Sequence, residues 1–371
     1  MSKVFFTDLR ASSKENLLDK VDKLFEAAGF SEIIEPKDLV ALKIHFGEKG
    51  NTGYIRPQFV RRIVDKVKGC QGKPFLTDAN TLYVGSRSNA VDHLQTAVEN
   101  GFDYAVVNCP LVIADGLTGK EYINVHIEGG KHLQEVKIGS AAYHSDAIIA
   151  VTHFKGHELT GFGGALKNLG MGLGSRSGKQ IMHSDVLPSV TEDKCIACGR
   201  CSEWCPAGAI EVEESAVAVI DKDKCIGCGE CTVTCTEGAI KVSWKTTPDI
   251  IQEKIAEFTA GVLKNKKGKA GYITFLMNVT PECDCVSFSD VPLVHDIGIL
   301  ASKDPVAIDQ ACIDLVNKAR VLHSSRIGGT PDVEDKFRAV HKHVDWSVQL
   351  AHGEKLGLGS RDYGLIQLSN S

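Results

Sequence analysis

Eight of the thirteen cysteines lie in the 41 residues from Cys195 to Cys235, in two copies of one spacing. The run Lys194-Cys-Ile-Ala-Cys-Gly-Arg-Cys recurs 30 residues later as Lys224-Cys-Ile-Gly-Cys-Gly-Glu-Cys, and each copy has a fourth cysteine four residues after its third. In a reducing compartment, such a cluster points to metal binding, because disulfides rarely persist there. The two copies predict one small pseudo-symmetric metal-binding module.

The spacing is C-x2-C-x2-C-x3-C, completed by Pro206 in the first copy, with Thr236 at that position in the second. Residues 191 to 245 thereby resemble a bacterial two-cluster ferredoxin, in which the fourth cysteine of each run crosses to the other [4Fe–4S] cluster. The resemblance implies one cluster on Cys195, Cys198, Cys201 and Cys235, and a second on Cys225, Cys228, Cys231 and Cys205. Zinc knuckles and redox-active disulfides are the alternatives.

This segment is also acidic. Residues 191–245 contain ten acidic and six basic side chains, a net charge of −4 out of −5 for the whole chain. An acidic cluster module can be steered to a basic redox partner protein, so we expect such a partner. The alternative is that the charge serves only solubility.

Outside the cysteine segment, strand-like and helical patterns alternate. We therefore predict an α/β fold, a mostly parallel sheet with helices on both faces, plus a small inserted α+β two-cluster ferredoxin-like domain. The predicted parts are 1–188, 189–245 and 246–371. The main strands are expected at 3–6, 40–44, 75–77, 146–152 and 272–279, and the main helices at 17–25, 57–68, 89–100, 250–263 and 304–319.

Potential metal ligands follow several of these strands. Ligands of open α/β sheets bind beyond the carboxyl ends of the strands, where His45, His153, His157 and the pair Cys283 and Cys285 should meet. In an extended segment, residues i and i+2 point the same way, so both thiolates could reach one ion. We predict a third site on these five residues for iron or zinc. Alternatively, they are polar loop histidines and packed free thiols.

The segment from His153 to Lys179 holds eight glycines in 27 residues and matches neither a Walker loop nor a dinucleotide fingerprint. We expect a loop whose free N–H groups, beside Lys155, Lys167 and Lys179, bind a small anionic substrate or cofactor. Lys167 is the candidate catalytic residue. The alternative is that the glycines allow close packing.

A second resemblance covers most of the remaining chain. The strings His153-Phe-Lys-Gly-His, Thr160-Gly-Phe-Gly-Gly-Ala-Leu-Lys-Asn-Leu-Gly-Met-Gly, Cys283-Asp-Cys and Asp296-Ile-Gly-Ile-Leu-Ala-Ser-Lys-Asp-Pro-Val-Ala-Ile-Asp are similar to the domain-of-unknown-function 362 family. Members often carry a 4Fe–4S module, which supports the insertion. The resemblance implies an iron–sulfur protein without a settled reaction.

The composition excludes several classes of protein. With 43% hydrophobic and 24% charged residues, the chain is neither disordered nor fibrous, and its net charge of −5 gives no reason to expect nucleic-acid binding. No apolar run is long enough for a membrane span and no signal core opens the chain, so we expect a cytoplasmic protein.

Three functions follow from these patterns. The first is an iron–sulfur redox protein, an oxidoreductase in which two clusters relay electrons to a metal or substrate site at the strand ends. The second is a carrier or maturation factor for metal or iron–sulfur clusters. The third is a non-redox enzyme with structural clusters.

Overall fold

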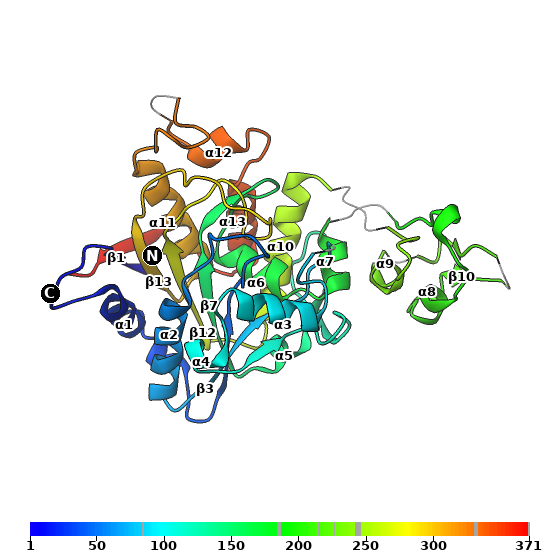
Figure 1. Cartoon of the computed structure of the whole chain (residues 1–371), viewed down its shortest axis with the longest axis horizontal. Helices are drawn as coiled ribbons and strands as arrows, with labels where there is room; N and C mark the ends of the chain where they lie inside the picture. The colour runs from blue at the N-terminus through cyan, green and yellow to red at the C-terminus, as the bar shows by residue number, and fades with distance from the viewer. Residues whose placement is uncertain are drawn as a thin grey trace.

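The body of the molecule is built on one eight-stranded sheet (Figure 1). In spatial order its strands are β14 (Tyr363–Gln367), β1 (Ser2–Asp8), β13 (Gly298–Ser302), β12 (Ala270–Leu276), β7 (Ala147–His153), β2 (Leu39–Lys43), β3 (Lys73–Asp78) and β4 (Leu111–Ile113). Of these eight, β13 alone runs antiparallel to its neighbours. The predicted α/β fold with a mostly parallel sheet is therefore confirmed. The computed structural model describes residues 1–83, 85–183, 187–213, 216–225, 227–241, 246–329 and 333–369.

Side chains alternate between the two faces of this sheet, and helices cover both. Val40 and Leu42 face a core shared with α1 and α2, whereas Ala41 faces the opposite core with α6, α10 and α11. The helices are α1 (Leu17–Ala27), α2 (Pro57–Gly69), α3 (Ala90–Glu99), α4 (Tyr104–Val107), α5 (Ser140–His144), α6 (Ala165–Leu173), α7 (Arg176–His183), α8 (Arg200–Glu203), α9 (Glu230–Thr234), α10 (Pro248–Leu263), α11 (Pro305–Lys318), α12 (Lys336–Val340) and α13 (Ser347–Lys355), with short 3-10 turns at Phe30–Ile33 and Glu192–Lys194.

Helix starts follow ordinary capping chemistry. Asn16 caps α1 through a reciprocal bond with Asp19, and Asp304 accepts two backbone N–H bonds at the start of α11, as the Asp-Pro pair predicts. Strand β12 ends at Leu276 rather than at the predicted residue 279, so a longer connection leads to the two cysteines.

The described residues between 187 and 241 form a separate lobe beside the body, seen at the right of Figure 1. It holds α8, α9 and one small antiparallel pair, β10 (Ile210–Glu211) and β11 (Val219–Ile220), around a core of its own that includes Cys201 and Cys231. The sheet resumes after this lobe with β12. The predicted boundary at residue 245 falls among residues 242–245, which lie outside the described ranges.

The glycine-rich segment is not the expected open loop. It folds into the hairpin β8 (Lys155–His157) and β9 (Gly161–Gly163), followed by α6 and α7. Its glycines serve close packing, which was the alternative. A Cβ at Gly164 would lie 2.3 Å from Asp309 Oδ1, and one at Gly170 would lie 2.2 Å from the carbonyl oxygen of Ile255 in α10.

A second hairpin, β5 (Tyr122–His126) and β6 (Glu135–Gly139), packs beside α10 and α7. Among the described residues, no helix combines the length and apolar character that a membrane span requires.

Candidate functional site

The eight cysteines of the lobe line two separate cavities. Cys195, Cys198, Cys201 and Cys235 line the first, and Cys205, Cys225, Cys228 and Cys231 line the second. Each cavity thus takes three cysteines from one run and the fourth from the other, the grouping that the ferredoxin resemblance implies. The backbone N–H groups of Ala209 and Ala239 donate to Sγ of Cys205 and Cys235 at 3.2 and 3.3 Å. Cluster binding itself stays a prediction.

The second cavity lies on the side of the lobe that contacts the body. Glu230, between Cys228 and Cys231 on α9, is only 4% exposed. Its Oε1 accepts hydrogen bonds from Lys137 Nζ at 2.9 Å and from the Tyr122 hydroxyl at 2.7 Å. The Lys137 ammonium holds the pKa of this carboxyl below its usual range, against the effect of burial, which raises it. A buried ion pair therefore joins the lobe to the β5–β6 hairpin.

Helix α7 separates this contact from a third cavity. On one side, Gln180 of α7 packs against Gly229 at the start of α9. The two residues are so close that a Cβ added to Gly229 would lie 2.4 Å from Gln180 Cγ. On the other side, Lys179 and His183 line the third cavity. The lobe and that cavity are thus separated by a single helix, about 10 Å across.

The third cavity, of about 310 Å³, lies at the carboxyl ends of β12, β7, β2 and β3, which are neighbours in the sheet. His45 follows β2, Asp78 ends β3, Lys155 follows β7, and Cys283 follows β12. The chain continues from β2 outward to β3 and β4 and then returns to β7 on the other side of β2. Such a reversal of strand order opens a crevice for ligands in α/β sheets.

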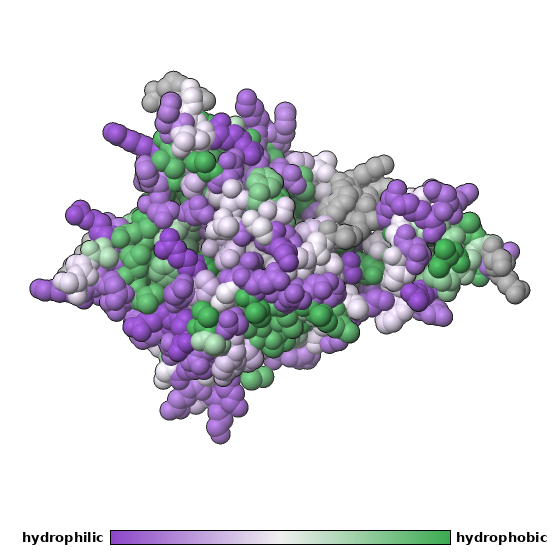
Figure 2. Space-filling view, viewed as in Figure 1, coloured by the Kyte–Doolittle hydropathy of each residue, from purple (hydrophilic) through white to green (hydrophobic). Residues whose placement is uncertain are grey.

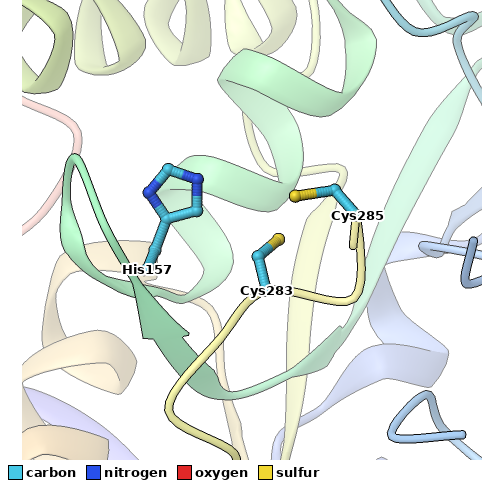
Figure 3. A group of neighbouring side chains, drawn as sticks. All are labelled: His157, Cys283 and Cys285. Carbon is cyan, nitrogen blue, oxygen red and sulfur yellow. The ribbon is translucent and has the colours of Figure 1, made fainter. Parts of the chain in front are cut away.

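Three of the predicted ligands converge at this cavity (Figure 3). His157 comes from β8, and Cys283 and Cys285 come from the segment after β12; His157 and Cys283 are buried. A hydrogen bond from Cys285 to Cys283 keeps the pKa of the Cys283 thiol well below its usual range, and the Lys167 ammonium, 3.6 Å from Cys283 Sγ, acts in the same direction. Both contacts therefore favour the thiolate form of Cys283, the form that binds metals.

The structure does not bring His153 to this group. Its Nδ1 faces both carboxylate oxygens of Asp284 at 3.0 and 2.9 Å, and its Nε2 faces two backbone carbonyl oxygens after β12 at 3.0 Å each. Both nitrogens face oxygen atoms within hydrogen-bond distance, so a ligand role for His153 does not fit this geometry. Nor do His153 and His157 share a helix, since they end separate strands.

His45 lines the cavity but is not part of the three-residue group. Its Nδ1 accepts the backbone N–H of Gly47 at 3.0 Å, which leaves Nε2 for other partners. Burial lowers the pKa of this imidazole well below its usual range, so the ring is neutral at physiological pH. A neutral ring can accept or donate one hydrogen bond to a ligand in the cavity.

Five cationic side chains also line the cavity, namely Lys43, Arg87, Lys155, Lys167 and Lys179. The first three pair with carboxylates of Asp78, Glu48 and Asp284. In the described part of the chain, Lys167 and Lys179 form no ion pair with a carboxylate; Lys179 donates to two carbonyl oxygens at 3.4 and 2.6 Å. Burial lowers the pKa of Lys179 to about 8. The cavity is therefore suited to an anion.

Comparison with known proteins places the chain in a family. Its sequence matches the family described as Domain of unknown function (DUF362) over residues 40–314, about three quarters of its length. The chain belongs to this family. No curated protein matches it.

Two solved structures are distantly similar to this DUF362 protein. The lactate racemase apoprotein from Thermoanaerobacterium thermosaccharolyticum is 14% identical, with a TM-score of 0.38, over 74% of this chain and 50% of the other. A protein from Thermotoga maritima is 13% identical, with a TM-score of 0.37, over 76% and 54%. The DUF362 chain thus spans about half the length of each, and neither likeness bears on its function.

Several residues of the DUF362 cavity escaped the sequence analysis. Arg87 is fully buried and reaches Glu48 and the Tyr83 hydroxyl, although it lies in no recognisable motif. Asn168 accepts from Lys43 Nζ at 2.8 Å. Asn168 follows Lys167 in the stretch from Thr160 to Gly172 that resembles the DUF362 family, so the sequence could have indicated it. No local sequence pattern indicates Arg87.

Proposed function

We propose that this protein is an iron–sulfur oxidoreductase whose lobe delivers electrons to the cavity at the strand ends of the α/β body. One observation carries the proposal. The eight lobe cysteines form two crossed groups of four, and the second group lies across a single helix from that cavity. When bound, two [4Fe–4S] clusters supply one-electron transfer at those cysteines.

The residues of the chain have distinct tasks in this proposal. The backbone N–H groups that point at Cys205 and Cys235 stabilise negative charge on sulfur and so tune the potential of whatever the sulfurs hold. Glu230 and Lys137 keep the second group against the body. The cationic cavity binds an anionic substrate.

The first cysteine group supports a docking role for a redox partner protein. Its helix α8 lies farther from the body than α9 does (Figure 1), and Ile196 beside Cys195 is 65% exposed. Figure 2 shows an apolar patch at the outer end of the lobe within a mostly hydrophilic surface. An acidic surface around an apolar contact suits a basic electron donor.

Iron analysis and electron paramagnetic resonance (EPR) test the proposal. Anaerobically purified full-length protein should contain about eight iron atoms per chain, and dithionite should generate two interacting cubane signals. Because the groups cross, Cys198→Ser and Cys235→Ser should alter one signal, and Cys228→Ser the other. Cys70→Ser, at the end of α2 and away from the lobe, is the matched control and should leave both signals intact.

Two results would contradict the proposal. One is zinc rather than iron in the purified protein. The other is that Cys235→Ser alters the signal that depends on Cys228, since that would show uncrossed groups.

A further inference from the structure

We propose that His157, Cys283 and Cys285 bind one divalent zinc or iron ion, and that its open side takes a small carboxylate- or phosphate-bearing substrate. This ion is separate from the lobe clusters. Its part in electron transfer rests on the proposed function, but its binding does not.

The geometry requires little rearrangement. The three ligand atoms lie within 4.8 Å of one another. Ligands about 2.0–2.3 Å from a tetrahedral ion lie roughly 3.5–3.8 Å apart, so a closure of about 1 Å completes the site. In Figure 3 the two sulfur atoms and the imidazole ring point toward one another across a shared space.

Contacts of Asp284 anchor the loop that carries Cys283 and Cys285. Asp284, between them, turns its carboxylate to His153 Nδ1 at 2.9 Å and to Lys155 Nζ at 3.4 Å. The cysteines lie in a turn, in which the Val286 N–H donates to the Cys283 carbonyl oxygen at 3.1 Å, and not in the extended segment expected from the sequence. Within this turn both sulfurs lie near His157, whereas the Asp284 carboxylate faces away to His153 and Lys155. Glu48 adds a backbone bond, because its N–H donates to the Asp284 carbonyl oxygen at 2.9 Å. This anchoring orients the two sulfur ligands as supporting contacts orient metal ligands elsewhere.

The donor set indicates an ion with an open position. Structural zinc sites are closed by four protein ligands, whereas two cysteines and one histidine leave room for a water or substrate. Soft sulfur with imidazole favours zinc or iron over magnesium or calcium. The space beside these ligands is the cavity of about 310 Å³, the size of a small-molecule site.

Loading the site should change the turn after His157. The imidazole Nδ1 accepts the Leu159 backbone N–H at 3.2 Å, so a neutral ring carries its proton on Nε2, the nitrogen facing the cysteines. An ion on Nε2 requires the remaining proton on Nδ1. The Leu159 amide, in the turn between β8 and β9, must then rotate away.

The class of substrate follows from two lysines of the cavity wall that have no carboxylate partner. Lys167, whose Nζ lies 3.6 Å from Cys283 Sγ, and Lys179 both line the cavity and form no ion pair with a carboxylate in the described ranges. An anion that contacts the ion can therefore also contact Lys167. Carboxylates and phosphates offer the several acceptor oxygens that such a pair of contacts needs.

Cobalt(II) is a suitable probe because its X-ray absorption edge is separate from that of cluster iron. The purified holoprotein should bind one cobalt(II), or retain one zinc, with two sulfur atoms and one imidazole nitrogen as neighbours. The double variant Cys283→Ser, Cys285→Ser should bind at least tenfold more weakly and keep its eight irons. His157→Gln should keep two sulfur neighbours with weaker binding, and Cys70→Ser should match the parent protein. Hydrogen exchange at residues 158–160 should change on loading.

The substrate class is tested on the cobalt-loaded protein with inorganic phosphate and malonate. Either anion should replace a light-atom neighbour of cobalt, and Lys167→Met should weaken that effect at least tenfold. Absence of sulfur neighbours would overturn the metal site, and absence of any anion effect would overturn the substrate class. A protein without lobe iron that still binds cobalt through sulfur would contradict only the proposed function. A protein with eight irons and no sulfur-bound cobalt would contradict only this proposal.

Discussion

Breaking the ion pair between Lys137 and Glu230 should loosen the cysteine-rich lobe from the α/β body. The two side chains are 11% and 5% exposed, their charged atoms are 2.9 Å apart, and the Tyr122 hydroxyl donates to the same carboxylate oxygen. Glu230→Ala leaves the Lys137 ammonium buried beside an aromatic ring without a counter-ion. Lys137→Ala leaves the carboxylate with neutral donors in place of a cation, among them the side chains of Tyr122 and Ser177.

The expected cost of each change follows from this burial. Removing one partner of a buried pair costs about 3–5 kcal/mol, chiefly because the other charge stays buried and unpaired. In the double variant neither charge remains, so we expect a total of about 3–4 kcal/mol rather than the sum of the two. The double-mutant cycle should therefore show a coupling of at least about 2 kcal/mol.

Urea unfolding of the anaerobic holoprotein, followed by circular dichroism, measures the free energies of the four proteins in the cycle. Hydrogen exchange in α7 should rise in both single variants, because α7 lies between the lobe and the cavity. The exposed pair Lys303 and Glu32 is the matched control, for which we expect no measurable coupling. Equal, small coupling in both cycles would refute the reasoning, since it would mean that the lobe does not dock through Glu230.

Three further predictions concern the body and its contact with the lobe. Asp309 accepts the N–H groups of Ala165 and Leu166 with separate carboxylate oxygens, at 2.7 and 3.0 Å. Asp309→Asn replaces one acceptor oxygen by an NH2 group and should lower the free energy of unfolding in urea by about 1–2 kcal/mol. Unchanged stability would contradict this prediction. Phosphate binding should weaken as the pH rises through about 8, because Lys179 then loses its charge, and titrations of Lys179→Met should lack this step. Gly229 has a φ of +72°, which strains any residue with a Cβ, and an added Cβ would also clash with Gln180 of α7. Gly229→Ala should therefore increase hydrogen exchange in α9, and unchanged exchange would mean that the contact with α7 is absent.

Part of the fold was predictable because its signals are local. The α/β alternation, the Asp-Pro start of α11 and the cysteine spacing each depend on neighbours within a few residues. The antiparallel direction of β13 and the two helices in the glycine-rich segment were not predictable in this way. Glycine lowers helix propensity, and tertiary contacts explain the glycines of α6: α10 approaches Gly170 and the Lys43 side chain approaches Gly172.

By itself, the sequence determined a repeated cysteine run, whose crossed grouping is what the ferredoxin resemblance implies, and two cysteines two residues apart after a strand. Tertiary structure alone decided which histidine meets them. His157 lies beside Cys283 although more than a hundred residues separate them, while Asp284 and two carbonyl oxygens occupy His153. It also placed Arg87 and Lys179 in the cavity wall. The reason is physical, because local spacing fixes the direction of a side chain along its own segment, but strand order and helix packing fix what that side chain faces.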